Sequence, residues 1–567
     1  MPAERPRYGV GAPLILLALV IIVWLPRFRG PIDLRWDAAV YYTLGTSLAE
    51  NKGYRLLNEP GEIKATQYPP LLPAFVAAHQ LVLGTSDPTV VGRGLRLSFF
   101  LLFAMYILTV YALARNELPL GYAFATALVC LFNAYTCFLS DSCFPEIAFA
   151  LLTLLFVLCH IRGGRSFSIL AAVLALAAYA LRTVGVSMIA AWVIEGLLKK
   201  QLKVASLRLV LLIAAIAGWQ SYIHYVETES TYARPAYEYQ RADYLFYNVS
   251  YSRNLLQRDP FSAGSDQVSS VDLMHRALGN LIQLPTRLGV AVTSDKYFWD
   301  AQWTALNTQL GFRLVPAWTI DAALILLASL ILLGVGLQLK RQPVIPLYVL
   351  LSVLSLSVAP WPEQFTRYFA PLTPFLALLL FLALRTVPGF FGRVAPPRRR
   401  LIETALAGSV LSMILVEDAL TFVMMYWKMH QNVTYVDQRG ERLTYRLFFY
   451  KDAYRALDAG LDWLKQRSNP DNVVASSMPH WTYLRTGLKA VMPPFETDPV
   501  RAQHLLDSLP VTFIVQDRGL DLDTRKYLSP VVQRFPERWR LVYHDVINEA
   551  PGRKPSETFE IYQRVVP

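Results

Sequence analysis

Long apolar stretches alternate with short polar segments along most of the chain. A helix needs about 20 mostly apolar residues to cross roughly 30 Å of hydrocarbon. The strands of an outer-membrane barrel are missing from this pattern. The pattern predicts a polytopic α-helical membrane protein with about eleven spans, near residues 9–25, 94–114, 117–138, 144–161, 166–181, 184–198, 204–224, 314–338, 343–360, 369–386 and 402–427.

A twelfth apolar stretch, residues 69–84, is short, begins with two prolines and is interrupted by His79 and Gln80. The loop charges decide its placement, because positive residues are retained in cytoplasmic loops. With eleven spans and the N-terminus inside, the short external loops keep only Arg182 and Arg367. If 69–84 also crossed, every later loop would change sides, so we expect an interfacial helix there. The predicted cytoplasmic cations are Arg5, Arg7, Arg115, Arg162, Arg165, Lys199, Lys200, Lys203, Lys340, Arg341, Arg385, Arg393, Arg398, Arg399 and Arg400.

Composition supports this topology. Of the 567 residues, 54% are hydrophobic and only 17% are charged, against roughly a quarter charged in soluble proteins, and the mean hydropathy is +0.33. The net charge of +12 resides mostly in short loops, which argues against a nucleic-acid partner. All four cysteines lie in or beside apolar stretches, so no disulfide framework or zinc site is expected in the soluble tail. No small-residue cleavage site follows the first apolar stretch, which predicts an uncleaved first span.

Two domains are expected. Residues 1–427 form the transmembrane catalytic module, with long external loops over 26–93 and 225–313. Residues 428–567 alternate helix and strand patterns at short spacing, which favours a non-cytoplasmic α/β domain. The predicted helices cover 452–467, 479–487 and 498–508, and the predicted strands cover 472–476, 489–493, 511–517, 539–545 and 558–565.

Asp37 lies about a dozen residues beyond the first span, in RWDAAVYYTLGTSLAENKGY. Helical spacing places Asp37, Tyr41 and the stretch from Leu44 to Leu48 on one face of a helix just above the membrane. A simple N-terminal helix cap is the alternative interpretation, since aspartate is favourable there.

The segment is similar to a known family. The aspartate, the paired tyrosines, NKGY and the following QYPPLLPAF resemble the GT-C superfamily of integral-membrane glycosyltransferases. The branch concerned uses dolichyl- or undecaprenyl-phosphate sugars, and it includes protein mannosyltransferases and the lipid A aminoarabinose transferase. The resemblance covers roughly residues 10–390.

The resemblance implies that Asp37 activates the acceptor and that the donor is a sugar on a polyprenyl phosphate. Tyr41, Tyr42 and Tyr68 in these motifs are expected to bind substrate. Where some relatives have an Asp-Glu pair, this chain has Asp37 followed by alanine. We therefore expect no cofactor, with a divalent metal as the open alternative.

A second acidic group lies at the external start of a predicted span, in SDSCFPEIAFALL. Carboxylates in a membrane are costly and usually functional. Glu146 is therefore a second catalytic candidate and Asp141 a substrate-binding candidate. A cap, or an ion pair between Glu146 and an arginine such as Arg182, is the alternative.

The two external arginines suit a phosphate, because the guanidinium is planar and always charged. Arg182 and Arg367 are expected to bind the donor phosphate, and Lys64 is a weaker candidate. The stretch RYFAPLTPFLALLL around Arg367 also resembles a late-span signature of the family. Interfacial snorkelling or pairing with Glu363 is the alternative.

Together these features predict a glycosyltransferase. It moves a sugar from a polyprenyl-phosphate donor to an acceptor hydroxyl on the non-cytoplasmic face, with inversion, because attack comes from the side opposite the phosphate. The expected partners are the donor, membrane lipid and a glycan, lipid or protein acceptor, and the expected location is a bacterial inner membrane. A lipid-linked oligosaccharide ligase or polymerase, and a transporter or flippase, stay open as alternatives.

Two further features are weaker. The aromatic run YARPAYEYQRADYLFYNVSYSRN suits sugar stacking as well as interfacial packing. In the tail, His480 and Trp481 fit a domain core or surface better than a site.

Overall fold

The computed structural model describes residues 11–311, 316, 318–390, 396–436, 440–517, 523–547 and 557–565. Arg5, Arg7 and Arg393, which the loop-charge argument places in the cytoplasm, lie outside these residues. The chain forms two compact units. The helical unit consists of Met1–Phe28, Leu97–Ala217 and Asp272–Trp427, and the mixed unit consists of Arg29–Arg96, Gly218–Val271 and Lys428–Pro567.

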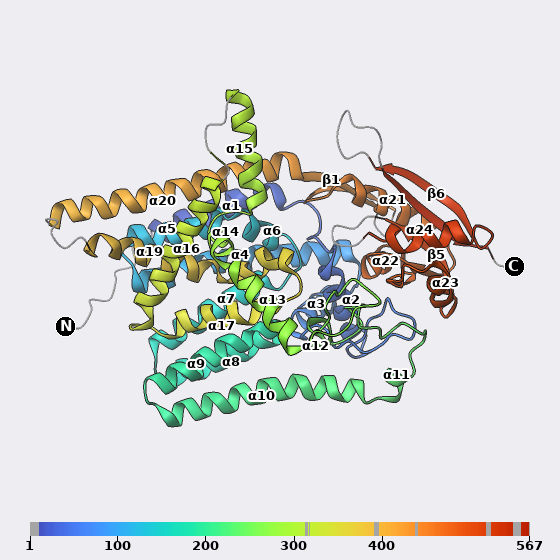
Figure 1. Cartoon of the computed structure of the whole chain (residues 1–567), viewed down its shortest axis with the longest axis horizontal. Coiled ribbons are helices and arrows are strands. Elements are labelled where there is room, and N and C mark those ends of the chain that lie inside the picture. The colour runs from blue at the N-terminus through green and yellow to red at the C-terminus, as the bar shows by residue number, and fades with distance from the viewer. Residues whose placement is uncertain are drawn as a thin grey trace. The chain divides into compact units, whose positions relative to one another are not determined.

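The helical unit is built from apolar helices that pack in pairs, α7 with α8, α9 with α17, and α16 with both α14 and α19 (Figure 1). α4, α10 and α13 each contribute residues to both units. The helices of this unit are α1 (Gly11–Trp24), α4 (Pro88–Glu117), α5 (Leu120–Phe132), α6 (Ala134–Ser140), α7 (Glu146–Arg162), α8 (Arg165–Leu181), α9 (Val186–Leu198), α10 (Leu202–Glu227), α13 (Ser270–Ile282), α14 (Leu284–Ala291), α15 (Lys296–Leu310), α16 (Trp318–Leu339), α17 (Val344–Ser357), α18 (Phe365–Phe369), α19 (Thr373–Thr386) and α20 (Pro396–Met424).

α19 is the core helix of this unit, since every residue from Thr373 to Leu384 is buried. A helix that is apolar on all sides is stable only when it is surrounded. α16 approaches it closely at Gly334, where a Cβ would collide with the backbone of Leu379. Small residues permit such contacts between membrane helices.

Five helical segments in the described part of the chain are long and apolar enough to cross a membrane, and a sixth forms if α5 and α6, bent by 61°, count as one. These segments correspond to six of the eleven predicted spans. Most of the other predicted spans, and the 69–84 stretch, form shorter apolar helices of 10–17 residues. The chain is a multi-pass membrane protein, and the count of eleven stays a prediction.

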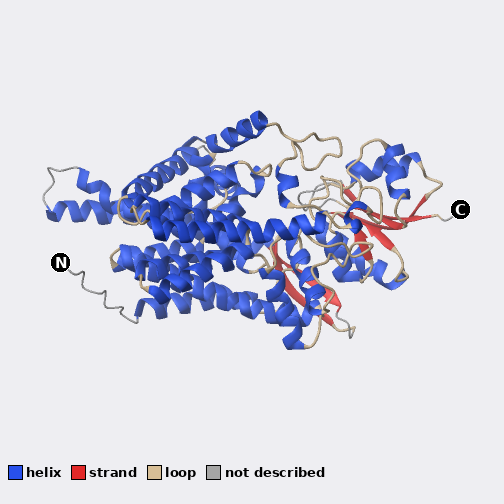
Figure 2. Cartoon of the chain, turned by 90° about the horizontal axis from the view of Figure 1, so that it is seen from below, coloured by secondary structure: helices blue, strands red, loops and turns tan. Residues whose placement is uncertain are grey.

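The mixed unit holds all the strands of the described residues, as Figure 2 shows in red. Most of the first predicted external loop, as Arg29–Arg96, and the first half of the second, up to Val271, belong to the same unit as Lys428–Pro567. Its helices are α2 (Asp37–Ala49), α3 (Leu71–Leu83), α11 (Ser230–Ala233), α12 (Tyr251–Leu255), α21 (Asp452–Arg467), α22 (Pro479–Thr486), α23 (Pro499–Asp507) and α24 (Arg525–Arg534), and its strands are β1 (His430–Val436), β2 (Arg442–Phe448), β3 (Val473–Ala475), β4 (Lys489–Val491), β5 (Val511–Gln516), β6 (Trp539–Ile547) and β7 (Glu557–Arg564).

The main sheet has the strand order β4-β3-β5-β7-β6. β3 is parallel to β4 and β5, whereas β7 is antiparallel to β5 and β6. β1 and β2 form a separate antiparallel pair.

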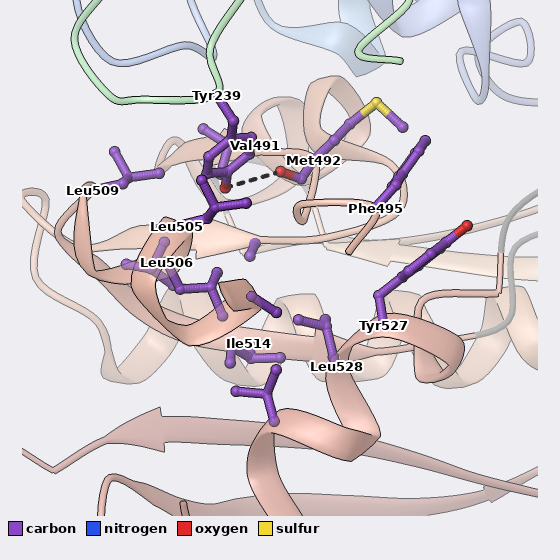
Figure 3. Packing of buried hydrophobic residues seen from close by; sticks show 14 of the residues in the cluster. Tyr239, Val491, Met492, Phe495, Leu505, Leu506, Leu509, Ile514, Tyr527 and Leu528 are labelled. Carbon is purple, nitrogen blue, oxygen red and sulfur yellow. Dashed lines mark hydrogen bonds between the residues drawn. The ribbon is translucent and has the colours of Figure 1, made fainter. Parts of the chain in front are cut away.

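Side chains alternate between the two faces of this sheet. Ile514 of β5 packs with Leu505 and Leu506 of α23 and Leu528 of α24, in the cluster of Figure 3. On the opposite face, α21 comes so close to β7 that a Cβ on Gly460 would overlap the Phe559 ring. Helices therefore cover both faces, as expected of an α/β domain.

The same core includes residues of the second external segment. Tyr237, Tyr239, Tyr244 and Leu245 are buried in the Figure 3 cluster, and the Tyr239 hydroxyl donates to the carbonyl of Met492, 3.3 Å away. The aromatic run thus packs against the C-terminal domain.

Candidate functional site

Asp37 is the first residue of α2. The N-cap position of this helix belongs to Trp36, whose side chain makes no capping hydrogen bond. Asp37 is therefore not the N-cap residue. Trp36 has φ +56° and ψ −135°, a conformation that costs of order 1–3 kcal/mol for a residue with a side chain. The backbone that aims Asp37 is therefore strained.

Residues of the C-terminal segment hold this strained turn. The Trp36 indole donates to the Tyr454 hydroxyl (2.8 Å). Arg35 is buried, pairs with Asp33 (2.6 Å) and donates to the carbonyl of Phe448 (2.7 Å). Its guanidinium also lies 4.3 Å from the Trp36 ring. Contacts with α21 and with the end of β2 hold the side chains of Trp36 and Arg35. These contacts maintain the strained backbone before Asp37.

Aromatic side chains surround Asp37. The Tyr247 hydroxyl donates to Asp37 Oδ1, 3.1 Å away. The Tyr247 ring lies 6.4 Å from that of Tyr68, which lies 4.8 Å from that of Tyr41. The structure therefore brings together Asp37 with two of its predicted substrate-binding tyrosines and adds Tyr247. Their roles stay predictions.

Two other candidates of this unit have different surroundings. Tyr42 is fully buried and donates to the carbonyl of Ser86 (2.8 Å). Lys64 forms an ion pair with Glu229, and this hydrogen bond raises the pKa of Lys64 above its ordinary value. Lys64 is thus already paired, which weakens its case as a phosphate ligand.

His480, the second residue of α22, also belongs to the surroundings of Asp37. Its ring lies 4.9 Å from the Tyr247 ring at 79°, and the residue is 2% exposed. Burial lowers the pKa of His480 to about 3, although the charge of Asp37 acts in the opposite direction. The imidazole is therefore neutral at physiological pH.

The remaining predicted site residues lie in the helical unit, where Glu146 begins α7. Its Oε1 accepts from Arg182 Nη1 and from Arg367 Nε, both at 2.7 Å. The Glu146 side chain is 0% exposed, and those of Arg182 and Arg367 are 15% and 13% exposed. The ion pair with Arg182 that the sequence offered as an alternative is thus present, and Arg367 joins it from 221 residues away.

In this cluster one carboxylate holds two guanidinium groups. Aromatic rings support both cations: Arg367 lies 4.2 Å from the Phe144 ring, and Arg182 lies 5.6 Å from the Tyr368 ring. Glu146 fixes the two arginines side by side, which is the arrangement that a phosphate group needs.

Asp141 is buried in the same unit, near a cation that the sequence interpretation did not single out. Arg27, at the end of the first apolar helix, donates to the carbonyl of Cys137 (2.8 Å) and to Ser140 (3.0 Å). The charge of Asp141 acts on Arg27. Asp141 therefore lies within electrostatic reach of a buried arginine, and its predicted contact with substrate stays a prediction.

A small cavity that is open to solvent lies in the helical unit. Mostly apolar side chains line it, with one cation and two neutral polar residues: Asn280, Leu281, Leu284, Arg287, Val353, Leu356, Ser357, Phe365 and Phe369. Phe365 and Phe369 belong to α18, the short helix that also carries Arg367. Two residues that line this cavity and the arginine predicted to bind the donor phosphate thus share one helix.

No group of three or more His, Cys, Asp or Glu side chains among the described residues could hold a metal ion. The absence of a cofactor stays a prediction. The sequence interpretation missed Arg35, Tyr247 and His480 as neighbours of Asp37. The aromatic run that contains Tyr247 was the one local signal.

No protein-family model and no curated protein matches the chain. Solved structures do match. The archaeal oligosaccharyltransferase AglB from Archaeoglobus fulgidus, in complex with an inhibitory peptide and a dolichol-phosphate, has a TM-score of 0.53 and 12% identity over 98% of this chain and 75% of that chain. ArnT from Cupriavidus metallidurans, bound to undecaprenyl phosphate, has a TM-score of 0.51 and 11% identity over 98% of both chains.

The chain has the GT-C fold. At 11–12% identity the likeness extends to the fold alone. The GT-C fold predicted from the Asp37 and QYPP motifs is thereby confirmed.

Proposed function

We propose that the protein is a glycosyltransferase that moves a sugar from a polyprenyl phosphate to an acceptor hydroxyl, on the non-cytoplasmic face of the membrane and with inversion. The observation that carries the proposal is the Arg182–Glu146–Arg367 cluster, in which one buried carboxylate holds two guanidinium groups. A sugar linked to a polyprenyl phosphate is a phosphodiester with one negative charge, and that charge grows as the sugar leaves.

The arginines meet the main demand of this chemistry. Preorganised cations stabilise charge that develops on a leaving group, and they do so best in a site that excludes water. Glu146 holds both guanidinium groups in place before the donor binds, so it acts as a positioning residue. Because the phosphate leaves as a stable anion, no acid is needed to protonate it, unlike in glycosidases.

The apolar cavity beside α18 supports a lipid donor, since Phe365 and Phe369 line it and Arg367 lies between them in sequence. The two structures of similar fold contain dolichol-phosphate and undecaprenyl phosphate. A polyprenyl phosphate offers this chain a charged group for the arginines and isoprene units for the cavity.

Asp37 supplies the base. Its carboxylate takes the proton of the acceptor hydroxyl while the acceptor oxygen forms a bond to the anomeric carbon. The bond between that carbon and the phosphate oxygen breaks, and its electron pair stays on the phosphate. The products are the glycosylated acceptor, protonated Asp37 and polyprenyl phosphate.

The test uses the full chain in detergent, with the polyprenyl-phosphate fraction and the delipidated envelope of a deletion strain as donor and acceptor. Asp37→Asn should reduce transfer by about 10²-fold or more while donor binding persists. Asp471→Asn, which changes an exposed aspartate of the same unit, is the control. An Asp37→Asn variant with wild-type transfer would refute the proposal. Mass spectrometry of the envelope glycans identifies the sugar and the acceptor.

A further inference from the structure

The turn between β3 and α22 follows the carboxyl end of a parallel strand, where open α/β sheets bind ligands. α22 begins at Pro479 and packs against α2, the helix that begins at Asp37. His480 lies in the first turn of α22. The C-terminal segment therefore places an imidazole beside the proposed base.

The contacts of His480 are specific. Its ring meets the Tyr247 ring edge-on at 4.9 Å, and Tyr247 in turn donates to Asp37 Oδ1 at 3.1 Å. The residue is 2% exposed, and its Nε2 is buried with no hydrogen-bond partner among the described residues. Leaving a buried polar nitrogen unpartnered costs about 1–3 kcal/mol.

The next residues of α22 show what a structural role looks like. The Trp481 indole donates to Asp458 (2.8 Å), and the Thr482 hydroxyl donates to Ser476 (3.0 Å). Both side chains are buried and have partners. At His480, a phenylalanine would pack on Tyr247 equally well and without the cost of an unpartnered nitrogen. The imidazole nitrogen therefore requires another explanation.

We infer that His480 is an acceptor-binding residue, whose Nε2 forms a hydrogen bond with a hydroxyl of the acceptor that Asp37 activates. The inference rests on the proposed function. A neutral imidazole suits this task, because it exchanges one hydrogen bond with a hydroxyl and adds no charge next to Asp37. The C-terminal domain thus takes part in acceptor selection.

The test compares two variants of the full chain in detergent. His480→Phe keeps the ring against Tyr247 and removes the nitrogen, whereas His480→Gln restores a polar end. The titrated acceptor is the delipidated envelope of the deletion strain, and the donor is the polyprenyl-phosphate fraction of that strain. We expect His480→Phe to raise the acceptor KM at least 10-fold, with the donor KM unchanged and the thermal midpoint unchanged or higher, and His480→Gln to recover part of the loss.

If the acceptor KM of His480→Phe equals that of the wild type, the inference is wrong. An equal loss toward donor and acceptor, or a lower thermal midpoint, would also overturn it, because each indicates a structural role. Asp37→Asn, assayed beside them, separates the two proposals: if it is inactive while His480→Phe is normal, only the role of His480 fails. If Asp37→Asn is active, the proposed function fails.

Discussion

Glu146→Gln is the most informative single substitution, because one buried carboxylate oxygen accepts from two arginines at 2.7 Å. The change removes the negative charge and keeps the size of the side chain. Arg182 and Arg367 then lose the charge of Glu146, in surroundings where their side chains are only 15% and 13% exposed.

The expected loss of stability follows from this burial. Removing one partner of a buried ion pair typically costs 3–5 kcal/mol, because the other charge stays buried. The glutamine amide oxygen still accepts one hydrogen bond, and both arginines retain some solvent, so we expect about 3 kcal/mol. The loss appears as a lower midpoint of thermal unfolding in detergent. The control is Glu363→Gln, the same change at an exposed glutamate near α18, which should leave the midpoint unchanged.

The kinetic effect is separate. With the arginines no longer fixed, the donor phosphate is misplaced, and an error of about 1 Å can reduce the rate about 100-fold. We expect the donor kcat/KM to fall about 10- to 100-fold and the acceptor KM to stay constant. Unchanged stability and donor kinetics would refute the positioning role of Glu146.

Four further predictions can be tested. Arg367→Met should weaken donor use, and Arg367→Lys should restore it only in part, because lysine keeps the charge but not the planar fork. Donor kinetics like those of the wild type in both variants would favour the alternative that Arg367 only extends toward the membrane surface. Tyr454→Phe removes the acceptor of the Trp36 indole and should lower thermal stability by about 1 kcal/mol and reduce transfer, and unchanged activity would mean that the strained turn does not depend on this bond. Burial raises the pKa of Asp517 to about 6 from 3.8, so this carboxyl favours folding below about pH 4 and loses that contribution, at most about 3 kcal/mol, as the pH rises through 6. In Asp517→Asn the midpoint of thermal unfolding should therefore depend less on pH over that range, and a pH dependence like that of the wild type would contradict this prediction. Reporter fusions at 341 and 565 should lie inside and outside the membrane respectively, and the reverse result would overturn the topology.

Local pattern was enough to predict the apolar helices and most of the α/β domain. The strands at 473–475, 489–491 and 511–516 lie within the predicted stretches, because alternation and burial are local signals. α24 and the β1–β2 pair were not predicted. α24 contains Pro530 in its interior. Proline is unfavourable inside a helix, so the sequence did not indicate a helix there.

Some of the candidate site residues could likewise be identified from the sequence, and others only from the structure. Glu146, Arg182 and Arg367 could be named from the sequence because charged residues at the external ends of apolar segments are rare and costly. Asp37 could be named from the resemblance of its segment to the GT-C superfamily. The sequence also offered the Glu146–Arg182 pair, whose members are 36 residues apart.

Only the tertiary structure showed that Arg367 shares the same carboxylate oxygen across 221 residues and that Tyr247 reaches Asp37 across 210. It also placed His480 beside this pair. Such contacts depend on which buried faces of distant segments pack together, and the periodicity of any single segment does not encode that choice. The sequence by itself determined the fold class and the charged residues, whereas long-range packing decided which of them act on one another.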